Sequence, residues 1–377
     1  MANNSLALGA AKTNKNDEFY TQLTDIEKEL RYYRKHFRGK TVFCNCDDPF
    51  ESNFFKYFVL NFNRLGLKKL IATCYSTSPI MGHQLRYRME EDGQMAIAFG
   101  DEDSTSWYDD GEKRPYKAVV TTVYDKTGDG GVDMLDVAEL FKSGENQLTE
   151  LEGDGDFRSP ECLALLDEAD IVVTNPPFSL FRKYVSTLME KQKHFIIIGN
   201  INAITYKEFF PLLKNNQIWI GASIHSGDRK FFVPDNYPLN ASGCWIDENG
   251  RRFIRVKGVR WYTNLDIRQR HEEMILVKRY SPDTYPKYDN YDAIEVGKTS
   301  EIPCDYAGVM GVPVTFMDKY NPDQFEIIGL DRYTVPKQFL VGGRVAINGK
   351  PRYARILIRN KHPERPREEQ HNGDNRV

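Results

Sequence analysis

The sequence predicts an α/β fold with a mostly parallel, doubly wound sheet, and three features of the chain favour it. Apolar runs typical of strands alternate with helical segments up to about residue 220, which is the order that parallel sheets require. The run 170–174 (DIVVT) is the strongest of these strands. Hydrophobic residues make up 40% of the 377 residues and charged residues 28%, so the chain can bury a sizeable core.

The first strand–helix–strand unit shows how the elements are recognised. Asp25 or Thr24 can cap a helix with an apolar stripe, and Gly39 ends that helix. The run 41–46 (TVFCNC) then predicts a buried strand. An aromatic-rich helix follows, Gly66 stops it, and the next apolar run begins.

The same signals predict a domain over residues 1–224, and a polar, acidic insertion at 76–117 interrupts it with a hairpin or irregular loops. Residues 1–16 are polar and without periodicity, so we expect an arm there. The expected helices are 25–37, 52–65, 132–141, 160–168, 180–191 and 206–213, and the expected strands are 41–46, 69–74, 117–123, 148–151, 170–174, 195–199 and 217–220.

Beyond residue 225 the helical pattern fades. Short β-like runs at 252–256, 274–278 and 353–358 predict a mostly β module over 225–377. Its charge is distinctive: residues 251–377 hold 23 Lys and Arg against 17 Asp and Glu, a net +6, although the whole chain carries −3. Residues 332–363 hold eight cations and no carboxylate, a pattern that suits a polyanion and equally suits a solvated charged face.

The composition also argues against several classes of protein. No stretch approaches the ~20 apolar residues of a membrane helix, and the first 16 residues lack the apolar core of a secretory signal. The six cysteines form no CxxC pair. We therefore expect reduced thiols, no metal site and a cytoplasmic protein.

The most informative motif is Asn175–Pro176–Pro177–Phe178, directly after the strand 170–174. Two prolines fix φ and remove two backbone donors, which predicts a rigid bend at the carboxyl end of the sheet, where open α/β folds bind ligands. There the Asn175 side-chain oxygen and the Pro176 carbonyl can accept both N–H bonds of an amine such as adenine N6, which localises its lone pair for attack. Phe178 would stack on the base. An ordinary Pro-Pro turn is the alternative.

This motif resembles the (N/D/S)PP(F/Y) motif of the S-adenosylmethionine-dependent amino methyltransferases of DNA, and its Asn and Phe resemble the adenine-N6 branch. The chain is more closely similar to the EcoRI-type adenine methyltransferases, through the segments 17–22 (DEFYTQ), 44–49 (CNCDDP) and 52–58 (SNFFKYF). The resemblance implies a Rossmann-like class I methyltransferase fold. It also implies an adenine-specific, site-specific DNA-methyltransferase that takes its methyl group from S-adenosylmethionine. Because N6 lies inside the duplex, the target adenine would be flipped out.

The resemblance assigns roles to single residues. The segment before the first strand would close over the methionine end of the cofactor, and the turn after that strand would cradle it. Asp156 would accept from the adenine amino group of the cofactor, and Phe157 would pack on its ring. The expected cofactor-binding residues are Phe19, Tyr20, Thr21, Asn45, Asp47, Asp48, Pro49, Asp156 and Phe157, and the expected catalytic residues are Asn175, Pro176, Pro177 and Phe178.

The basic C-terminal region would supply contacts to double-stranded DNA and sequence readout. The expected DNA-binding residues are Arg344, Lys350, Arg352, Arg355 and Arg359. Phe231 or Phe232 is a candidate for the second face of the base pocket, with a role in the core as the alternative. The resemblance further implies a bacterial or phage-encoded enzyme that protects DNA, either beside a restriction endonuclease or as a stand-alone methylase.

The chain departs from the wider superfamily at two places. The first turn contains no glycine, and no acid ends the second strand, where Thr73-Cys74-Tyr75 stands. Two alternative functions stay open. One is that of another enzyme with the same Asn-Pro-Pro-Phe motif, which methylates an RNA base or a protein glutamine amide. The other, favoured by the atypical first turn, is a DNA-binding homologue that has lost catalysis.

Overall fold

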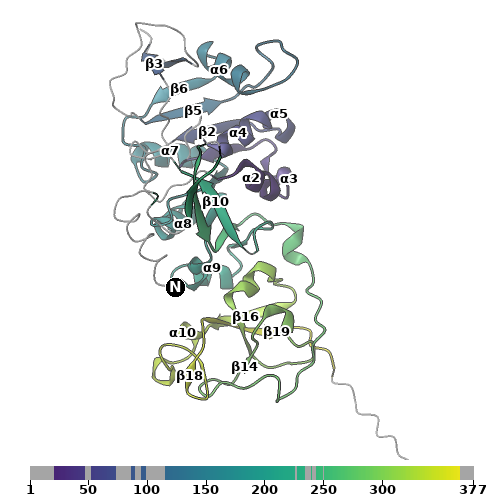
Figure 1. The fold of residues 1–377 in the computed structure, drawn as a ribbon. Helices are drawn as coiled ribbons and strands as arrows, with labels where there is room; N and C mark the ends of the chain where they lie inside the picture. Colours follow the sequence, from purple (N-terminus) through teal and green to yellow (C-terminus); the bar gives the residue numbers. More distant parts are fainter. Residues whose placement is uncertain are drawn as a thin grey trace, which may run out of the picture. The chain divides into compact units, whose positions relative to one another are not determined.

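The computed structural model describes residues 21–46, 52–73, 86–89, 95–98, 115–225, 227–233, 239, 243–248 and 250–365. The chain forms two compact units (Figure 1). Residues 1–203 and 218–265 form the N-terminal unit, and residues 204–217 and 266–377 form the C-terminal unit.

A large mixed sheet forms the core of the N-terminal unit, with the strand order β6-β5-β2-β1-β7-β8-β13-β9. The four central strands are mutually parallel, whereas β5 and β13 each pair antiparallel with both neighbours. The strands are β1 (Thr41–Cys44), β2 (Lys69–Thr73), β5 (Tyr116–Val120), β6 (Gln147–Glu150), β7 (Ile171–Thr174), β8 (His194–Asn200), β9 (Trp219–Ile220) and β13 (Val259–Thr263). Six of these eight strands therefore point in one direction.

Helices join the parallel strands in two opposite directions from the centre of the sheet. Helices α4 (Asn53–Leu60) and α5 (Phe62–Leu65) lead from β1 outward to β2, whereas α8 (Phe181–Glu190) leads from β7 to β8 on the other side. Because such crossovers are right-handed, α4 and α8 lie on opposite faces. Figure 1 shows α4 and α5 on one side of the sheet and α7 (Pro160–Glu168) and α8 on the other. Helix α6 (Met134–Lys142) lies between β5 and β6 in the chain.

Local signals account for the ends of these helices. The Ser52 hydroxyl accepts a hydrogen bond from the Phe54 N–H and caps α4, and the Ser159 hydroxyl caps α7, which has Pro160 in its first turn. Gly66 ends α5 in a left-handed conformation with φ of 64°. Asp133 and Asp136 form a reciprocal capping box at α6.

The N-terminal helix α2 (Leu23–Leu30) is fixed to the end of β9 by a buried carboxylate. Glu29 is fully buried and accepts hydrogen bonds from the backbone N–H groups of Ala222 and Ser223, at 2.8 and 2.7 Å. Burial raises the pKa of Glu29, and these hydrogen bonds act in the opposite direction. A short helix α3 (Arg34–Phe37) follows.

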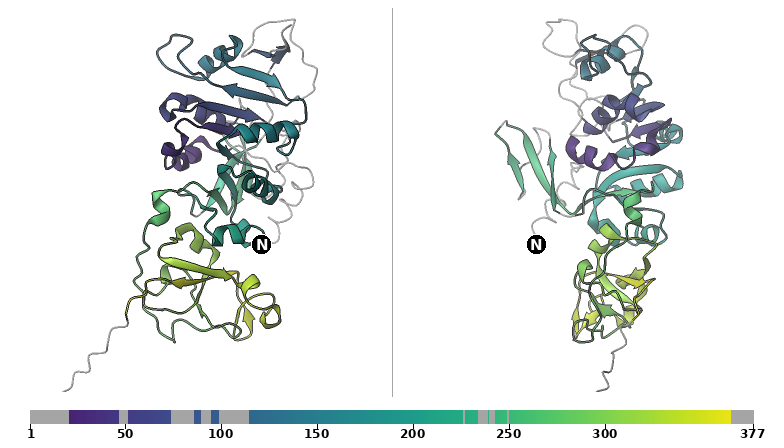
Figure 2. Two further views of the ribbon diagram at one scale, coloured as in Figure 1. Left: turned by 180° about the vertical axis from the view of Figure 1, so that it is seen from behind. Right: turned by 90° about the vertical axis from the view of Figure 1, so that its right-hand side faces the viewer.

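A second, smaller sheet belongs to the N-terminal unit and stands away from its helix and sheet layers (Figure 2). It contains β10 (Asp228–Phe232), β12 (Arg252–Lys257) and β11 (Cys244–Ile246), in that order and antiparallel. The strands β3 (Arg86–Met89) and β4 (Met95–Ala98) form a separate hairpin.

The C-terminal unit is built on a four-stranded sheet with the order β14-β15-β19-β16. Its strands are β14 (Ile294–Glu295), β15 (Met310–Pro313), β16 (Phe325–Leu330) and β19 (Arg355–Asn360), and its short helices include α9 (Phe210–Lys214) and α10 (Asp331–Thr334). Strands β17 (Ala346–Ile347) and β18 (Lys350–Pro351) form a hairpin around Asn348 and Gly349. The positive φ values of these two residues, 53° and 69°, fit a two-residue type I′ turn.

Several sequence predictions are confirmed at this level, and others are wrong. The mixed α/β fold with its large, mostly parallel sheet is confirmed, and the antiparallel pair β3 and β4 lies within the predicted insertion 76–117. The expected helix 25–37 is interrupted between α2 and α3, and residues 274–278 form no strand beyond a single bridge at Lys278.

The domain boundary at 224/225 needs correction. Strand β13 pairs with both β8 and β9 in the central sheet, and β10 to β12 belong to the same unit. The segment 204–217 instead belongs to the C-terminal unit, so the chain passes between the two units more than once.

Candidate active site

The site begins at the carboxyl ends of two neighbouring strands. β1 and β7 are parallel, with Val42 opposite Ile171 and Phe43 opposite Val172. Continuing this register by two residues brings Asn45, just after β1, beside the end of β7 and the start of the Asn175 motif. The sheet order also reverses here, since β2 lies on one side of β1 and β8 on the other side of β7. Such a switch point is where open α/β sheets bind ligands.

The Asn-Pro-Pro-Phe motif forms the corner that its two prolines predict. Asn175 is 5% exposed, Pro176 and Pro177 are buried, and Phe178 is half-buried. A turn closes at once, because the Leu180 N–H donates to the Pro177 carbonyl at 3.0 Å. Helix α8 begins at Phe181. The corner is therefore held between a buried strand and a helix start, which limits its freedom to move.

A tyrosine that the sequence analysis did not select connects the two strand ends. The hydroxyl of Tyr184, in the first turn of α8, donates to the side-chain oxygen of Asn45, and both residues are buried. Side chains of a helix lean towards its N-terminus, so Tyr184 points back to the sheet edge from which α8 starts. The signal available in the sequence was its place in the first turn of the helix that follows the Asn-Pro-Pro-Phe motif.

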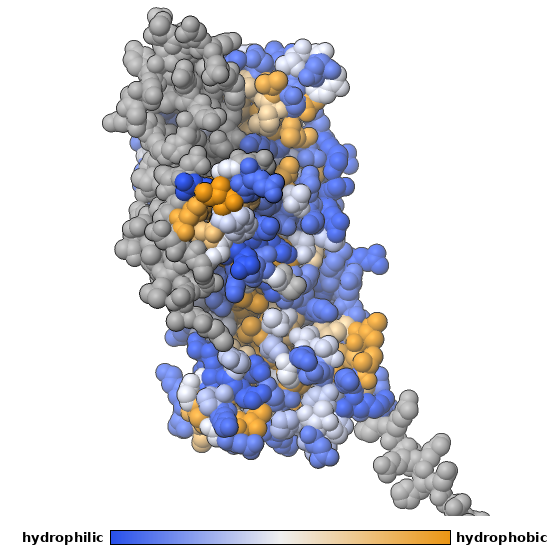
Figure 3. Space-filling view, in the orientation of Figure 1, coloured by the Kyte–Doolittle hydropathy of each residue, from blue (hydrophilic) through white to orange (hydrophobic). Residues whose placement is uncertain are grey.

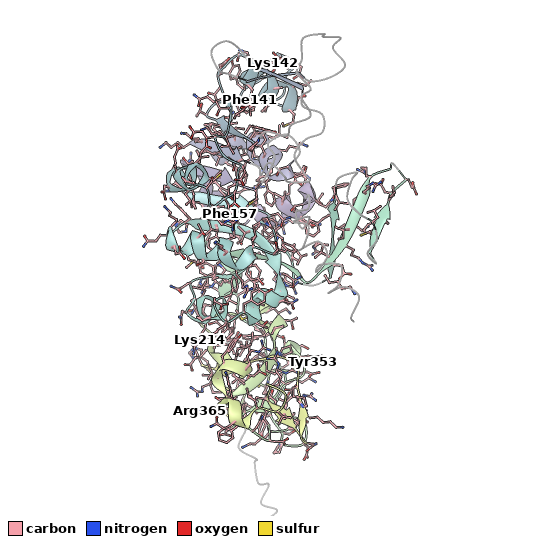
Figure 4. All side chains as sticks on the ribbon, turned by 90° about the vertical axis from the view of Figure 1, so that its left-hand side faces the viewer. Phe141, Lys142, Phe157, Lys214, Tyr353 and Arg365 are labelled. Atoms are coloured by element: carbon pink, nitrogen blue, oxygen red, sulfur yellow. The ribbon has the colours of Figure 1, made fainter. Side chains whose placement is uncertain are left out.

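Phe157 completes this buried cluster. Its ring meets the ring of Tyr184 edge to face, with centroids 5.0 Å apart, and it is 5% exposed. Figure 4 labels Phe157 within the layers of the N-terminal unit. The structure thus brings together three predicted or newly found positions, Asn45, Phe157 and Tyr184, beside the Asn175 corner.

Asp156 lies next to Phe157 but has a cationic partner. Its carboxylate forms an ion pair with Arg158 and accepts a hydrogen bond from the Arg158 backbone N–H at 2.9 Å. The Arg158 guanidinium also lies 5.4 Å from the centre of the Phe157 ring. A ligand that uses the Asp156 carboxylate would share it with Arg158.

Thr21 is the remaining described member of the predicted cofactor set. It is 4% exposed, and its carbonyl accepts a hydrogen bond from the Asn53 amide at 2.7 Å, at the start of α4. This contact brings the segment before β1 to the helix that follows β1. The other predicted cofactor residues lie outside the described residues: Phe19, Tyr20, Asp47, Asp48 and Pro49.

The predicted DNA-binding cations occupy different environments in the C-terminal unit. Lys350 is exposed on the β17–β18 hairpin. Arg344, Arg352 and Arg359 each pair with a carboxylate, and the exposed fractions of their side chains are 19%, 41% and 47%.

Arg355 corrects the prediction. Its side chain is 8% exposed, and its guanidinium donates to both oxygens of Glu295, which is 5% exposed. Burial alone would raise the pKa of Glu295, but the hydrogen bonds from Arg355 and Tyr288 outweigh it and lower that pKa. A guanidinium committed to a buried carboxylate is unavailable to a phosphate, so Arg355 is a core residue.

The two phenylalanines proposed for the second face of the base pocket are adjacent in β10, and their side chains point to opposite faces of the strand. Phe231 is 2% exposed, whereas Phe232 is half-buried and its ring lies 4.4 Å from that of Phe253. Adjacent residues of a strand point to opposite faces, so only one of them faces outward from β10.

Among the described residues, no group of three or more His, Cys, Asp and Glu side chains is arranged to hold a metal ion. No helix in the described ranges has the length and apolarity that crossing a membrane would need.

The fold and the motif together define a class. A mixed α/β fold with a mostly parallel central sheet and an Asn-Pro-Pro-Phe corner at its carboxyl edge is that of an amino methyltransferase. The chain belongs to the EcoRI family of adenine-specific methyltransferases, whose family model matches residues 7–361. It is an adenine-specific DNA methyltransferase.

Curated relatives match nearly the whole chain. The Type II methyltransferase M.EcoRI of Escherichia coli is 45% identical over 356 residues, which cover 94% of this chain and 96% of the relative. The Type II methyltransferase M.MpnI of Mycoplasma pneumoniae is 34% identical over 365 residues, 93% of this chain and 97% of the relative. M.MgeORF184P of Mycoplasma genitalium is 32% identical over 367 residues. No solved structure matches the chain significantly.

Proposed function

We propose that this enzyme transfers a methyl group from S-adenosylmethionine to N6 of an adenine at a specific site in duplex DNA, after that adenine leaves the helix. The observation that carries the proposal is the position of Asn175. It stands in a rigid, buried corner at the switch point of the sheet, next to the end of β1.

The proposed role of the corner is to hold and activate the amine. The Asn175 side-chain oxygen and the Pro176 carbonyl are acceptors on adjacent residues, and together they suit the two N–H bonds of adenine N6. Accepting both bonds draws electron density onto the nitrogen and fixes its direction of attack. Phe178, half-buried beside them, would stack on the base and help to exclude water.

The described residues at the strand ends fit a cofactor that carries an adenine ring and polar groups. We propose that Asn45 and Thr21 line its binding site, that Phe157 packs on its ring, and that Asp156 accepts from its amino group in competition with Arg158. Phe19, Tyr20, Asp47, Asp48 and Pro49 complete the proposed set. S-adenosylmethionine would supply an activated methyl group, so no metal is needed for the transfer.

We propose further that the sheet with helices on both faces is a doubly wound, Rossmann-like catalytic domain. The C-terminal unit would then contact DNA through Arg344, Lys350, Arg352 and Arg359, with Arg355 removed from the original set. Sequence readout would depend on which side chains reach a groove.

A biological setting follows from the relatives. M.EcoRI and M.MpnI are named Type II methyltransferases, which supports a role in restriction–modification or related protection of DNA. We propose that the enzyme works where the DNA lies, in the cytoplasm of a bacterial or phage-infected cell. Pairing with a restriction endonuclease is part of this proposal.

The decisive experiment supplies labelled S-adenosylmethionine together with duplex DNA, RNA or protein. Label that appears as N6-methyladenine in duplex DNA supports the proposal. Label in RNA or in protein glutamine instead would select the other Asn-Pro-Pro-Phe reactions. Failure to bind S-adenosylmethionine in calorimetry would select the DNA-binding homologue without catalysis.

A matched pair of variants tests the role of Asn175. Asn175→Ala should lower turnover by a factor of about 10² or more while DNA affinity stays close to that of the wild type, because transition-state interactions are lost. Asn264→Ala removes an amide that accepts from the Phe195 N–H at 2.9 Å, just after antiparallel β13 and hence at the opposite edge of the sheet. It should leave turnover of the folded fraction nearly unchanged. Equal losses in both variants would remove Asn175 from the mechanism.

A further inference from the structure

The small sheet β10–β12 sorts its side chains into two chemically different faces. Along β12 and the residue before it, Arg251, Phe253, Arg255 and Lys257 alternate with Arg252, Ile254 and Val256, so the two sets point to opposite faces. The register extends this pattern across the sheet. Phe232 and Trp245 lie opposite Phe253, and Lys230 lies opposite Arg255.

One face, which we call the inner face, is turned towards the body of the N-terminal unit. It carries Phe231, which is 2% exposed, and Val256, which is 6% exposed. Arg229 on the same face lies 3.9 Å from the Asp25 carboxylate of α2. These contacts use the inner face for attachment to the unit.

The other face, which we call the outer face, carries a row of three aromatic rings across three strands. The Phe232 and Phe253 centroids are 4.4 Å apart, and Trp245 stacks on Phe253 at 5.2 Å with an interplanar angle of 10°. At the position of β10 in Figure 1, Figure 3 shows hydrophobic and hydrophilic residues side by side on the surface.

Cations lie over these rings. The Lys230 ammonium is 5.3 Å from the Trp245 ring centre, and the Arg251 guanidinium is 5.4 Å from that of Phe232 and 5.9 Å from that of Phe253. Such contacts hold a long side chain in place while its charge stays accessible. The exposed fractions of the Arg251 and Arg255 side chains are 56% and 53%.

The charge of the outer face favours an anionic partner. Among the described residues it holds Lys230, Arg251, Arg255 and Lys257 against Asp228 and Asp247, a net charge of 4 − 2 = +2. Two cations are paired, Arg251 with Asp247 and Arg255 with Asp228. Arg251 and Arg255 stand four residues apart and Arg255 and Lys257 two, or roughly 13 and 7 Å along an extended chain, spacings that can follow successive phosphates.

We propose that the outer face of β10–β12 is a DNA-backbone contact surface, in which the aromatic row fixes Lys230 and Arg251 in position and Arg255 and Lys257 extend the line of charge. The inference rests on the DNA substrate proposed above and adds a surface outside both the Asn175 corner and the basic C-terminal segment. Cations held over rings lose less side-chain freedom when they meet a phosphate, so the rings contribute to affinity without touching the DNA.

A double variant of the full-length enzyme tests the phosphate contacts. Lys230→Gln/Arg255→Gln should lower the slope of log affinity against log salt by about 1.8 for a 30-base-pair duplex of random sequence, because each lost phosphate contact removes about 0.9. The control Lys126→Gln/Lys142→Gln makes the same change in charge on exposed residues at the α6 end of the unit, where Figure 4 labels Lys142 far from the small sheet. Its slope should equal that of the wild type. Equal slopes in the two double variants overturn the proposal.

A second variant tests the aromatic row. Trp245→Leu should weaken DNA binding about 2- to 5-fold at a fixed salt concentration while the salt slope stays unchanged, because the number of phosphate contacts is preserved. Unchanged affinity would overturn the positioning role of the rings. Sedimentation of each variant, with the wild type alongside, would reveal whether the face joins two copies of the chain instead, and a dimer lost in Trp245→Leu would also overturn the proposal.

The wild type separates this inference from the proposed function. If the wild type does not methylate duplex DNA, the proposed function fails whatever the variants do. If it methylates DNA and the Lys230→Gln/Arg255→Gln variant keeps the full salt slope, only the outer-face inference fails.

Discussion

The hydroxyl of Tyr184 joins residues 139 positions apart in the sequence, since its partner Asn45 follows β1 while Tyr184 itself lies on α8. The sequence pattern places each residue on its element, but it contains no information on which helix turn faces which strand end. Asn175 was predictable for a different reason. Two prolines after an apolar strand restrict the chain so strongly that the bend follows from covalent geometry alone.

Tyr184→Phe removes the hydroxyl and leaves the ring against Phe157. We expect the dissociation constant for S-adenosylmethionine to rise about 2- to 10-fold, the effect of one net hydrogen bond, because Asn45 loses the contact that orients its amide. Calorimetry measures the binding, and thermal unfolding tests for a merely structural effect. Tyr262→Phe is the control, since its hydroxyl donates to the Asn200 carbonyl at 2.9 Å elsewhere on the sheet. An equal loss of affinity in both variants would contradict the assignment.

Arg355 shows where charge patterning fails at the residue scale. A sequence cannot distinguish an arginine on a solvated face from one in a β-sheet core with a carboxylate 60 residues away. The apolar run 356–358 that follows Arg355 in β19 was a partial signal, because a continuous apolar run predicts a largely buried strand.

We expect different effects from substituting Arg355 and Lys350, because Arg355 is buried in an ion pair with Glu295 and Lys350 is exposed. Arg355→Met leaves the Glu295 carboxylate buried without its main partner, so the C-terminal unit should lose about 3–5 kcal/mol of unfolding free energy. Lys350→Gln should leave that stability unchanged and lower the salt slope of DNA binding by about 0.9. Hydrogen exchange of β19 amides and binding titrations measure the two effects. A normal exchange rate in Arg355→Met with a reduced salt slope would restore Arg355 to the DNA surface.

At the scale of elements, the central strands and the helices between them were predictable, and the weak strands were not. Strands β1, β2 and β7 are apolar runs bounded by turn residues. The segment 274–278 has a similar pattern, yet Ile275 and Val277 are 88% and 74% exposed in the structure. The alternation of apolar and polar residues does not reveal whether a neighbouring strand exists to pair with such a run.

An exposed histidine links two loops of the C-terminal unit and makes their stability depend on pH. The ring nitrogens of His271 lie 2.9 Å from the carboxylates of Asp323 and Asp266, and these two hydrogen bonds raise its pKa above 6.5. A raised pKa in the folded state means that the stabilisation is complete below the unfolded value and is lost as pH rises through the folded value.

The expected result is a stability difference that disappears at high pH. Wild type should resist urea better than His271→Gln near pH 6, and the two midpoints should converge as pH rises above the folded-state pKa. Asp323→Asn should show part of the same trend. A difference that stays constant or grows with pH would contradict the charged pairing.

At the scale of the whole molecule, the two units are interleaved in sequence, and this was the least predictable feature. Strand β13 enters the central sheet after the chain has formed β10 to β12, and the segment 204–217 leaves the N-terminal unit before β9 returns to it. Each return depends on pairing between segments that lie tens of residues apart. A change of composition near residue 225 therefore marked a change of local structure and not a domain boundary.

Truncated chains test this organisation directly. A chain ending at residue 224 lacks β13, which stands between β8 and β9, so it should expose the edge of β8 and fail to form a protease-resistant unit. A chain ending at residue 265 keeps all eight strands of the central sheet. It lacks most of the C-terminal unit, to which α9 belongs, and so loses the hydrogen bond from Lys214 of α9 to the Ile328 carbonyl at 2.7 Å. It should resist proteolysis in its sheet while being cleaved within 204–217. If the shorter chain instead proves as resistant as the longer one, β13 is not part of the folded core.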